Sequence, residues 1–255
     1  MMTDTDVLRG RAATGGPGSV PRRYGRWVPI VQSLRRFFAV LLGLGLLGLP
    51  MTASDAQAQT SPSNTGGRPL KLVALGDSLT AGYNLPASAA FPVVLEKALR
   101  EKGIAVDIVN AGVSGDTTQG GLERLDWSVP DGTDGVILEL GANDALRGLD
   151  PALPRQALDT IIARLKARNI PVLLAGMYAP RNLGGDYVRR FDAIYPELAQ
   201  KYGLVLYPFF LEGIAGDKAL NQADGLHPTA EGVKTIVRNI LPSVERFIAT
   251  LPPRS

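Results

Sequence analysis

The chain contains no cysteine and a single histidine among its 255 residues. The lack of cysteine excludes disulfide bonds, thiol catalysis, thiolate metal sites and acylation as a lipoprotein. Histidine and carboxylate residues do not cluster at the spacing of metal ligands, and the glycine-rich "GDTTQGG" lacks the lysine of a phosphate-binding loop. We therefore expect a protein that works without a metal and without a cofactor.

A hydrophobic run long enough to cross a membrane is also missing. The apolar stretch "FFAVLLGLGLLGL" at 37–49 has 13 residues, whereas a bilayer span needs about 20. Seven arginines precede residue 59, and "AQA" at 56–58 is a small-residue cleavage site. A basic region, a short apolar core and such a site are typical of a secretory signal peptide. We expect residues 1–58 to be removed and the mature protein to be periplasmic or secreted; a retained N-terminal anchor is the alternative.

Once this leader is set aside, a strong excess of one charge is missing as well. The chain has 27 basic and 24 acidic residues, of which residues 1–58 hold 7 and 3, leaving 20 basic and 21 acidic residues. The basic character of the whole chain belongs largely to the leader. The remainder shows no electrostatic footprint of a nucleic-acid-binding protein, and we expect no nucleic-acid partner.

Strand and helix patterns alternate through the rest of the chain. Residues 59–69 are rich in Ser, Thr, Gly and Pro, which predicts a flexible lead-in. Runs rich in Val, Ile and Leu then predict strands at 70–75, 105–110, 135–140, 171–176 and 204–208. Helical patterns are found at 91–102, 119–125, 156–168 and 186–202. The alternation predicts one α/β domain over 70–252, with a parallel sheet covered on both faces.

The most periodic segment is the last one. Apolar residues from Val233 to Ile248 follow the helical i, i+3, i+4, i+7 spacing. Pro242 lies within this segment, and we expect it to kink the helix or to split it in two.

Ligands of parallel sheets bind outside the carboxyl ends of the strands, and "LGDSLTAG" at 75–82 follows the first predicted strand. Its Gly, Asp and Ser are turn formers, but Ser78 could also be a nucleophile if a base were close. The lone histidine, His227, lies three residues after Asp224 in "DGLHP", and Pro228 disfavours a helical backbone there. Imidazole suits a general base near neutral pH, and a carboxylate can orient it. Ser78, His227 and Asp224 therefore form a predicted catalytic triad.

Two further loops offer hydrogen-bond donors for a developing oxyanion. Gly115 follows the second predicted strand and Asn143 follows the third. Together with the N–H of Ser78, they could supply three donors to one oxygen. Taken singly, each is an ordinary loop residue. The nearby Asp77, Asp116 and Asp144 are interpreted as carboxylates that brace these loops.

Four stretches in order, "GDSLTAG", "SGDTT", "GANDALRG" and "DGLHP", resemble the motifs of the SGNH, or GDSL-type, hydrolases. Within that family the chain is similar to the exported bacterial arylesterase and thioesterase I/lysophospholipase branch. The resemblance implies a flavodoxin-like three-layer α/β/α fold with a five-stranded parallel sheet and metal-free hydrolysis of acyl esters and thioesters. It also implies Ser78 as nucleophile, Asp224 and His227 as acid and base, and Gly115 and Asn143 as oxyanion residues. No G-x-S-x-G elbow of the lipase type frames Ser78.

The substrate is the least determined part of this hypothesis. The loops 145–150 and 177–185 are expected to line an acyl groove, where Leu146, Leu149, Ala179 and Pro180 favour an apolar acyl group over a sugar. Aryl esters, acyl-CoA and lysophospholipids are candidate substrates, and we expect the enzyme to act as a monomer. A carbohydrate O-acyl esterase or an acyltransferase on the same fold is the alternative. A non-catalytic binding module is disfavoured because all three triad residues are present.

Overall fold

The computed structural model describes residues 68–252. The predicted signal peptide at 1–58 and residues 59–67 of the predicted lead-in lie outside the described residues. Within the described part, the last lead-in residues are already tied to the domain. The Arg68 guanidinium pairs with the Asp134 carboxylate through Nη1–Oδ2 and Nη2–Oδ1 contacts of 2.6 and 2.7 Å.

A five-stranded sheet forms the centre of the domain, as predicted. Its strands are β1 (Leu70–Gly76), β2 (Val106–Gly112), β3 (Gly135–Glu139), β4 (Val172–Ala175) and β5 (Val205–Tyr207). All neighbouring strands are parallel, in the order β2-β1-β3-β4-β5. The strands β3 and β4 are buried along their whole length, because helices cover both faces of the sheet. This pattern explains their unbroken apolar runs and confirms the predicted α/β class.

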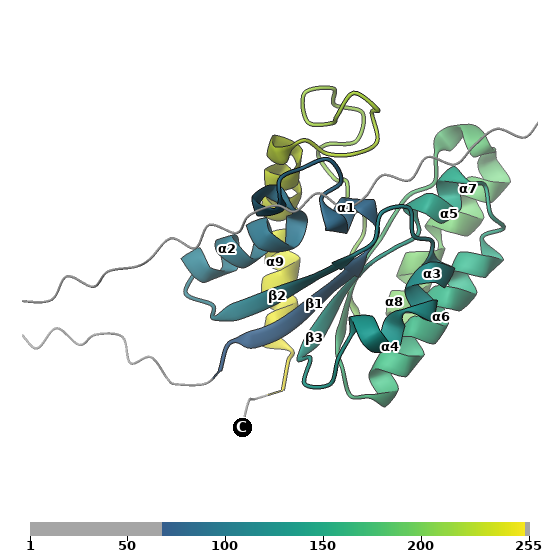
Figure 1. Ribbon diagram of the computed structural model, residues 1–255. Coiled ribbons are helices and arrows are strands. Elements are labelled where there is room, and N and C mark those ends of the chain that lie inside the picture. The colour runs from purple at the N-terminus through teal and green to yellow at the C-terminus, as the bar shows by residue number, and fades with distance from the viewer. Residues whose placement is uncertain (1–67, 253–255) are drawn as a thin grey trace, which may run out of the picture. The chain divides into compact units, whose positions relative to one another are not determined.

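The helices form two outer layers (Figure 1). On one face of the sheet lie α2 (Phe91–Glu101) and α9 (Ala230–Ala249), which pack against each other. On the other face lie α3 (Thr118–Glu123), α4 (Leu125–Ser128), α6 (Ala152–Ala167) and α8 (Ile194–Tyr202). The remaining helical segments are α1 (Ser78–Ala81), α5 (Ala142–Leu146), α7 (Gly185–Asp192) and the 3₁₀ turns η1 (Ala87–Ala89) and η2 (Arg181–Leu183). The short helices α1 and α5 directly follow β1 and β3, at the carboxyl edge of the sheet.

The single helix predicted at 186–202 is wrong. The structure divides this segment into α7 and α8, with the break at Ala193. Pro196 lies in the first turn of α8 and has no N–H, so the helical hydrogen bond back to Asp192 is missing at this point.

Of the two outcomes expected at Pro242, a kink or a split, the split is wrong, because α9 continues through the proline. Pro242 is exposed, while Val237, Ile240 and Val244 keep a continuous buried stripe across the proline. Packing of this stripe therefore holds the helix together despite the lost hydrogen bond. Within residues 68–252, no helix combines the length and the apolar character that crossing a bilayer requires.

Candidate active site

Ser78 lies where β1 gives way to a short helix, rather than in an open loop. Asp77 is the N-cap of α1, and its Oδ1 accepts a hydrogen bond of 3.0 Å from the Leu79 N–H. The preceding Gly76 allows a close approach, since a Cβ there would lie 2.0 Å from Thr80 Oγ1. Each residue of "GDS" therefore has its own structural role. Gly76 ends the strand at a position where only glycine fits, Asp77 caps the helix, and Ser78 is the first helical residue. Together they hold the Ser78 hydroxyl at the carboxyl edge of the sheet.

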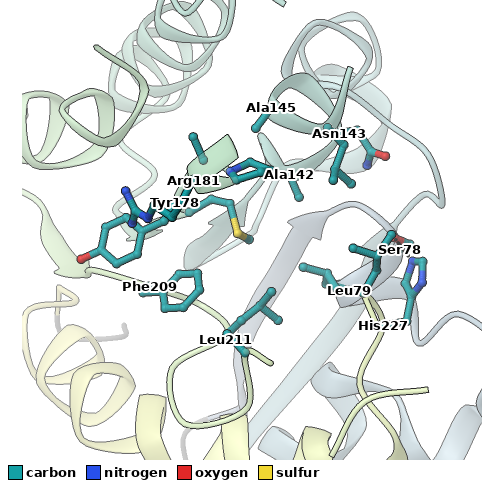
Figure 2. Close-up of a pocket in the computed structure, with 16 residues that line it drawn as sticks. Ser78, Leu79, Ala142, Asn143, Ala145, Tyr178, Arg181, Phe209, Leu211 and His227 are labelled. Carbon is teal, nitrogen blue, oxygen red and sulfur yellow. Dashed lines mark hydrogen bonds between the residues drawn. The ribbon is translucent and has the colours of Figure 1, made fainter. Parts of the chain in front are cut away.

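His227 and Asp224 lie in the loop before α9 and face Ser78. The His227 Nε2 is 2.9 Å from Ser78 Oγ, and its Nδ1 is 2.7 Å from Asp224 Oδ2. Figure 2 shows the imidazole beside the serine at one end of a pocket. With the ring proton on Nδ1, His227 donates a hydrogen bond to the carboxylate, and Nε2 is left to accept a hydrogen bond from the serine hydroxyl.

The Asp224 carboxylate is locked in place by the backbone of its own turn. Its Oδ1 accepts hydrogen bonds from the N–H groups of His227 and Leu226, at 3.0 and 2.9 Å. These backbone bonds, and then the bond from the His227 ring, lower the pKa of Asp224 to about 2. The group is therefore a carboxylate throughout the neutral range.

The two predicted oxyanion residues lie on neighbouring loops. Gly115 has a φ of +83° in a turn that the Asp116 N–H closes by donating to the Val113 carbonyl at 3.1 Å. Asn143 is the second residue of α5, and its Nδ2 is 2.9 Å from the Asp116 carbonyl oxygen. Among the described residues, no group accepts a hydrogen bond from the N–H of Ser78 or of Gly115. Both donors are thus available to a substrate oxygen.

Two carboxyl groups are buried directly beneath this site. Asp77 is fully buried and its Oδ2 lies 3.2 Å from the Asn143 amide Nδ2. Glu139, at the end of β3, accepts a hydrogen bond of 2.8 Å from the Thr80 hydroxyl. Burial raises the pKa of Asp77 to about 7. Burial, together with the nearby Asp77 charge, raises the pKa of Glu139 well above its usual range. Glu139, for which the sequence carries no local signal, therefore keeps its proton to higher pH than an exposed glutamate does.

This raised pKa leads to a prediction about stability. In the unfolded chain Glu139 ionises near pH ~4.3, whereas in the folded protein it keeps its proton to higher pH. Its contribution to stability is fully present below the unfolded pKa and is lost as the pH rises through the folded pKa. A glutamine at this position cannot lose a proton. We therefore expect the unfolding temperature of Glu139→Gln, measured relative to that of the wild type, to increase as the pH rises from 5 to 9.

Thermal unfolding of both proteins at pH 5, 7 and 9 measures the difference between their unfolding temperatures. Glu101→Gln, at an exposed position in α2, is the matched control and should show a constant difference. If the difference in unfolding temperature between Glu139→Gln and the wild type does not change with pH, Glu139 is ionised in the folded protein.

A buried arginine, which the sequence did not mark as functional, connects the strands to the loop that carries Gly115. Arg124 donates from Nη2 to the Gly76 carbonyl and from Nη1 to the Ala111 carbonyl, both at 2.8 Å. Its Nε is 2.6 Å from Asp116 Oδ2. The ends of β1 and β2 are thereby fixed relative to the loop that carries Gly115. In "GGLERL" this residue resembles any exposed helical arginine, so no local signal reveals its role.

The other bracing carboxylate lies on the opposite side of that loop. Asp144 accepts hydrogen bonds from the N–H and the hydroxyl of Thr118, at 2.9 and 2.8 Å. It thereby joins α5 to the start of α3. This contact agrees with the structural role that we expected for Asp144.

An apolar pocket of about 480 Å³ opens beside the serine. The predicted groove residues Leu146, Ala179 and Pro180 line it. So do further side chains that the sequence analysis did not select: Leu79, Met177, Phe209 and Leu211. Figure 2 shows Ser78 and His227 at one end and Tyr178 and Phe209 at the other, with Leu79 and Leu211 between them. The rings of Tyr178 and Phe209 stack with their centroids 4.7 Å apart. The pocket is therefore an apolar channel with an aromatic end.

Leu149, the fourth predicted groove residue, does not line this pocket. It borders a separate hollow with Leu122 and Leu153, between α3 and α6. A turn at Gly148, whose φ is +62°, separates Leu149 from α5, which contributes Leu146 to the pocket. The inclusion of Leu149 in the groove is therefore corrected.

The chemistry that this arrangement can perform is acyl transfer to a serine. A hydroxyl and a base oriented by a carboxylate lie at one end of an apolar pocket, and the N–H of the serine has no acceptor among the described residues. Within residues 68–252, no three histidine or carboxylate side chains are grouped so that they could hold a metal ion.

Known proteins with similar sequences and structures are esterases and acylhydrolases. The model of the GDSL-like lipase/acylhydrolase family matches residues 74–234. An esterase TesA of Pseudomonas aeruginosa is 35% identical over 82% of this chain and 98% of its own length. The thioesterase 1/protease 1/lysophospholipase L1 of Escherichia coli is 42% identical over 63% of this chain and 76% of its own.

Among solved structures, the SGNH-hydrolase family esterase AlinE4 shares 49% identity at a TM-score of 0.61. The match covers 71% of this chain and 98% of that esterase. A match across the motif-bearing region, a full-length relative and a shared fold agree with one another. The chain belongs to the GDSL-like lipase/acylhydrolase family, the SGNH hydrolases, and is an enzyme of that family.

Proposed function

We propose that this enzyme is a serine esterase that hydrolyses acyl esters and thioesters through an acyl-enzyme on Ser78. The observation that carries the proposal is the continuous hydrogen-bonded series from Ser78 Oγ to His227 Nε2 and from Nδ1 to Asp224, at 2.9 and 2.7 Å. As Oγ bonds to the acyl carbon, His227 accepts the hydroxyl proton. Asp224 then stabilises the resulting imidazolium.

The remaining steps follow from the same groups. The tetrahedral intermediate places its negative oxygen toward the N–H groups of Ser78 and Gly115 and the Asn143 amide. As the carbonyl re-forms, the bond to the alcohol or thiol breaks and His227 gives that leaving group its proton. A water molecule then attacks the acyl-enzyme, again losing a proton to His227, and releases the carboxylic acid and the free serine.

The pocket supports an apolar acyl group as the part of the substrate that is recognised. Leu79 and Leu211 flank the path from Ser78 toward the stacked Tyr178 and Phe209 (Figure 2). Burying each methylene of an acyl chain along such a wall contributes about 0.8 kcal/mol. The relatives named as esterase and as thioesterase and lysophospholipase also act on acyl groups. A carbohydrate acetyl esterase would need a polar, not an apolar, surface beside the serine.

A panel of p-nitrophenyl esters from acetate to palmitate, with acyl-CoA and lysophospholipid, tests this proposal. We expect kcat/KM to rise with chain length until the chain meets the aromatic end of the pocket, and then to fall. Tyr178→Ala should move the preferred length to longer chains. Trp127→Ala, at an exposed residue outside the pocket, is the control. Faster release of acetate from an acetylated sugar than from any apolar ester would favour the carbohydrate esterase instead.

Export remains a proposal that rests on the sequence of the leader alone. We expect the signal to be cleaved after Ala58, so that the mature enzyme begins near Gln59 and is found in the periplasm or the medium. Intact-mass measurement of enzyme from the native cell tests this. A mass that includes the leader would support the retained anchor.

A further inference from the structure

Arg147 follows α5 and contacts both loop residues of the proposed oxyanion hole. Its guanidinium Nη2 lies 2.6 Å from the carbonyl oxygen of Gly115. Its main-chain N–H donates to the carbonyl of Asn143 at 3.1 Å. The bond to Asn143 is the helical bond that ends α5. The bond to Gly115 comes from an exposed side chain, so neither the helix nor burial in the core accounts for it. The reaction steps described above do not use it.

The bond to Gly115 restrains one particular peptide unit. The peptide between Gly115 and Asp116 has its N–H bonded to the Val113 carbonyl and its carbonyl bonded to Arg147. The Gly115 N–H is separated from this fixed plane only by the backbone torsions of Gly115. Glycine opposes rotation about these torsions less than any other residue. Without Arg147, this peptide would keep its N–H bond to Val113, and the following residue would still be held at its side chain by Arg124 and at its carbonyl by Asn143. The carbonyl of Gly115 itself would lose the hydrogen bond from Arg147.

The strength of the contact suits this task. A hydrogen bond from a charged guanidinium is shorter and roughly twice as strong as one between neutral groups. The same residue joins the turn that carries Gly115 to the helix that carries Asn143. The side chain of Arg147 makes the contact to the turn, and its backbone makes the contact to the helix.

We propose, building on the function proposed above, that Arg147 is a positioning residue for the oxyanion hole. It holds the Gly115 peptide so that its N–H stays directed at the substrate oxygen, in register with the Asn143 amide. Leu146, its neighbour in sequence, lines the acyl pocket. An acyl chain packed against Leu146 would restrict the motion of the end of α5, where Arg147 is located.

Arg147→Ala and Arg147→Lys test this role with p-nitrophenyl butyrate as the substrate. Removing an oxyanion donor outright costs about 10²–10³ in kcat, so misdirecting one should cost somewhat less. We expect kcat of Arg147→Ala to fall by about 10- to 100-fold, with KM nearly unchanged. The lysine variant and added methylguanidinium should each restore part of the loss. Arg168→Ala is the matched control, because Arg168 also donates from Nη2 to a carbonyl at 2.6 Å, that of Val129, outside the pocket beside Ser78.

Two inhibitors separate positioning from a general loss of stability. Butylboronic acid bonds through boron to Ser78 Oγ and places a boron-bound oxygen in the oxyanion hole, whereas butyrate imitates the released product. In Arg147→Ala the inhibition constant of the boronic acid should rise by the same factor by which kcat/KM falls, and that of butyrate should stay constant. Partial unfolding would lower the rate but leave both constants unchanged.

Three results would overturn the proposal: a kcat of Arg147→Ala within twofold of the wild type, a boronic acid constant that does not change, or an equal loss in Arg168→Ala. Failure of the underlying function is distinguished by Ser78→Ala. An active Ser78→Ala enzyme would overturn the esterase mechanism itself. An inactive Ser78→Ala together with a fully active Arg147→Ala would overturn only the role of Arg147.

Discussion

Ser78→Ala should reduce hydrolysis of p-nitrophenyl butyrate to near background, a loss on the order of 10⁶ in kcat, as expected when a catalytic serine is removed. The physical reason is that, among the described residues, Ser78 carries the only hydroxyl that is hydrogen-bonded to the His227 imidazole. The oxyanion donors would remain, so a small residual rate above that of water is expected.

Covalent labelling gives an independent measurement of the same residue. A phosphonofluoridate should form one P–O bond to Ser78 Oγ with loss of fluoride, which adds one phosphonyl group per wild-type chain in intact-mass analysis. Ser78→Ala should remain unlabelled. Ser243→Ala, at a buried serine in α9, should be labelled and active like the wild type. Full activity in Ser78→Ala would remove the nucleophile from the proposed mechanism.

Asp224→Asn should lower kcat by about 10⁴-fold while the protein stays folded, because an amide can impose the wrong tautomer on the histidine and cannot stabilise the imidazolium. The carboxylate has its pKa lowered to about 2 by backbone hydrogen bonds and the His227 ring. Its charge is therefore present at every pH between 5 and 9, and the loss in the variant should be similar across this range.

The lowered pKa of Asp224 also determines how its contribution to folding stability changes with pH. The folded-state pKa of Asp224 lies below the ordinary value, so its contribution is present above about pH 4 and is lost as the pH falls toward 2. Because the side chain is partly exposed, we expect that contribution to be small. Thermal unfolding near pH 7 should therefore show only a modest decrease for Asp224→Asn.

Asp217→Asn is the matched control for this variant. Asp217 Oδ1 also accepts a backbone N–H two residues ahead, from Ala219 at 2.8 Å, but its hydrogen bonds do not involve the histidine. Its activity should stay near that of the wild type. A rate for Asp224→Asn within tenfold of the wild type would show that Asp224 does not orient the base.

The predictable parts of this fold are those that depend on short stretches of chain. Apolar runs such as "GVILEL" identified the buried strand β3 to within about a residue, because a strand covered on both faces has to be apolar throughout. Helix breaks were less predictable. Pro196 and Pro242 have the same local effect on hydrogen bonding, yet only the segment before Pro196 is divided in the structure. The continuous buried stripe of α9 decides the difference, and that stripe exists only against the folded sheet.

What the sequence determined by itself is the chemistry of the candidate site. Asp224 and His227 are three residues apart, and a single turn places the carboxylate on the imidazole. "GDS" likewise carries its own glycine, cap and hydroxyl. Such groups are predictable because their geometry depends on neighbours in the chain, which the sequence displays directly.

Only the tertiary structure decided how these local units meet. Ser78 reaches a histidine 149 residues away. Arg147 reaches a carbonyl 32 residues away, and the raised pKa of Glu139 is caused by burial and by the nearby Asp77 charge. Contacts of this kind depend on which strand lies next to which, on the direction in which each loop leaves the sheet, and on the exclusion of water from the space between them. None of these is a property of a short segment, because each arises only when distant parts of the chain are packed together.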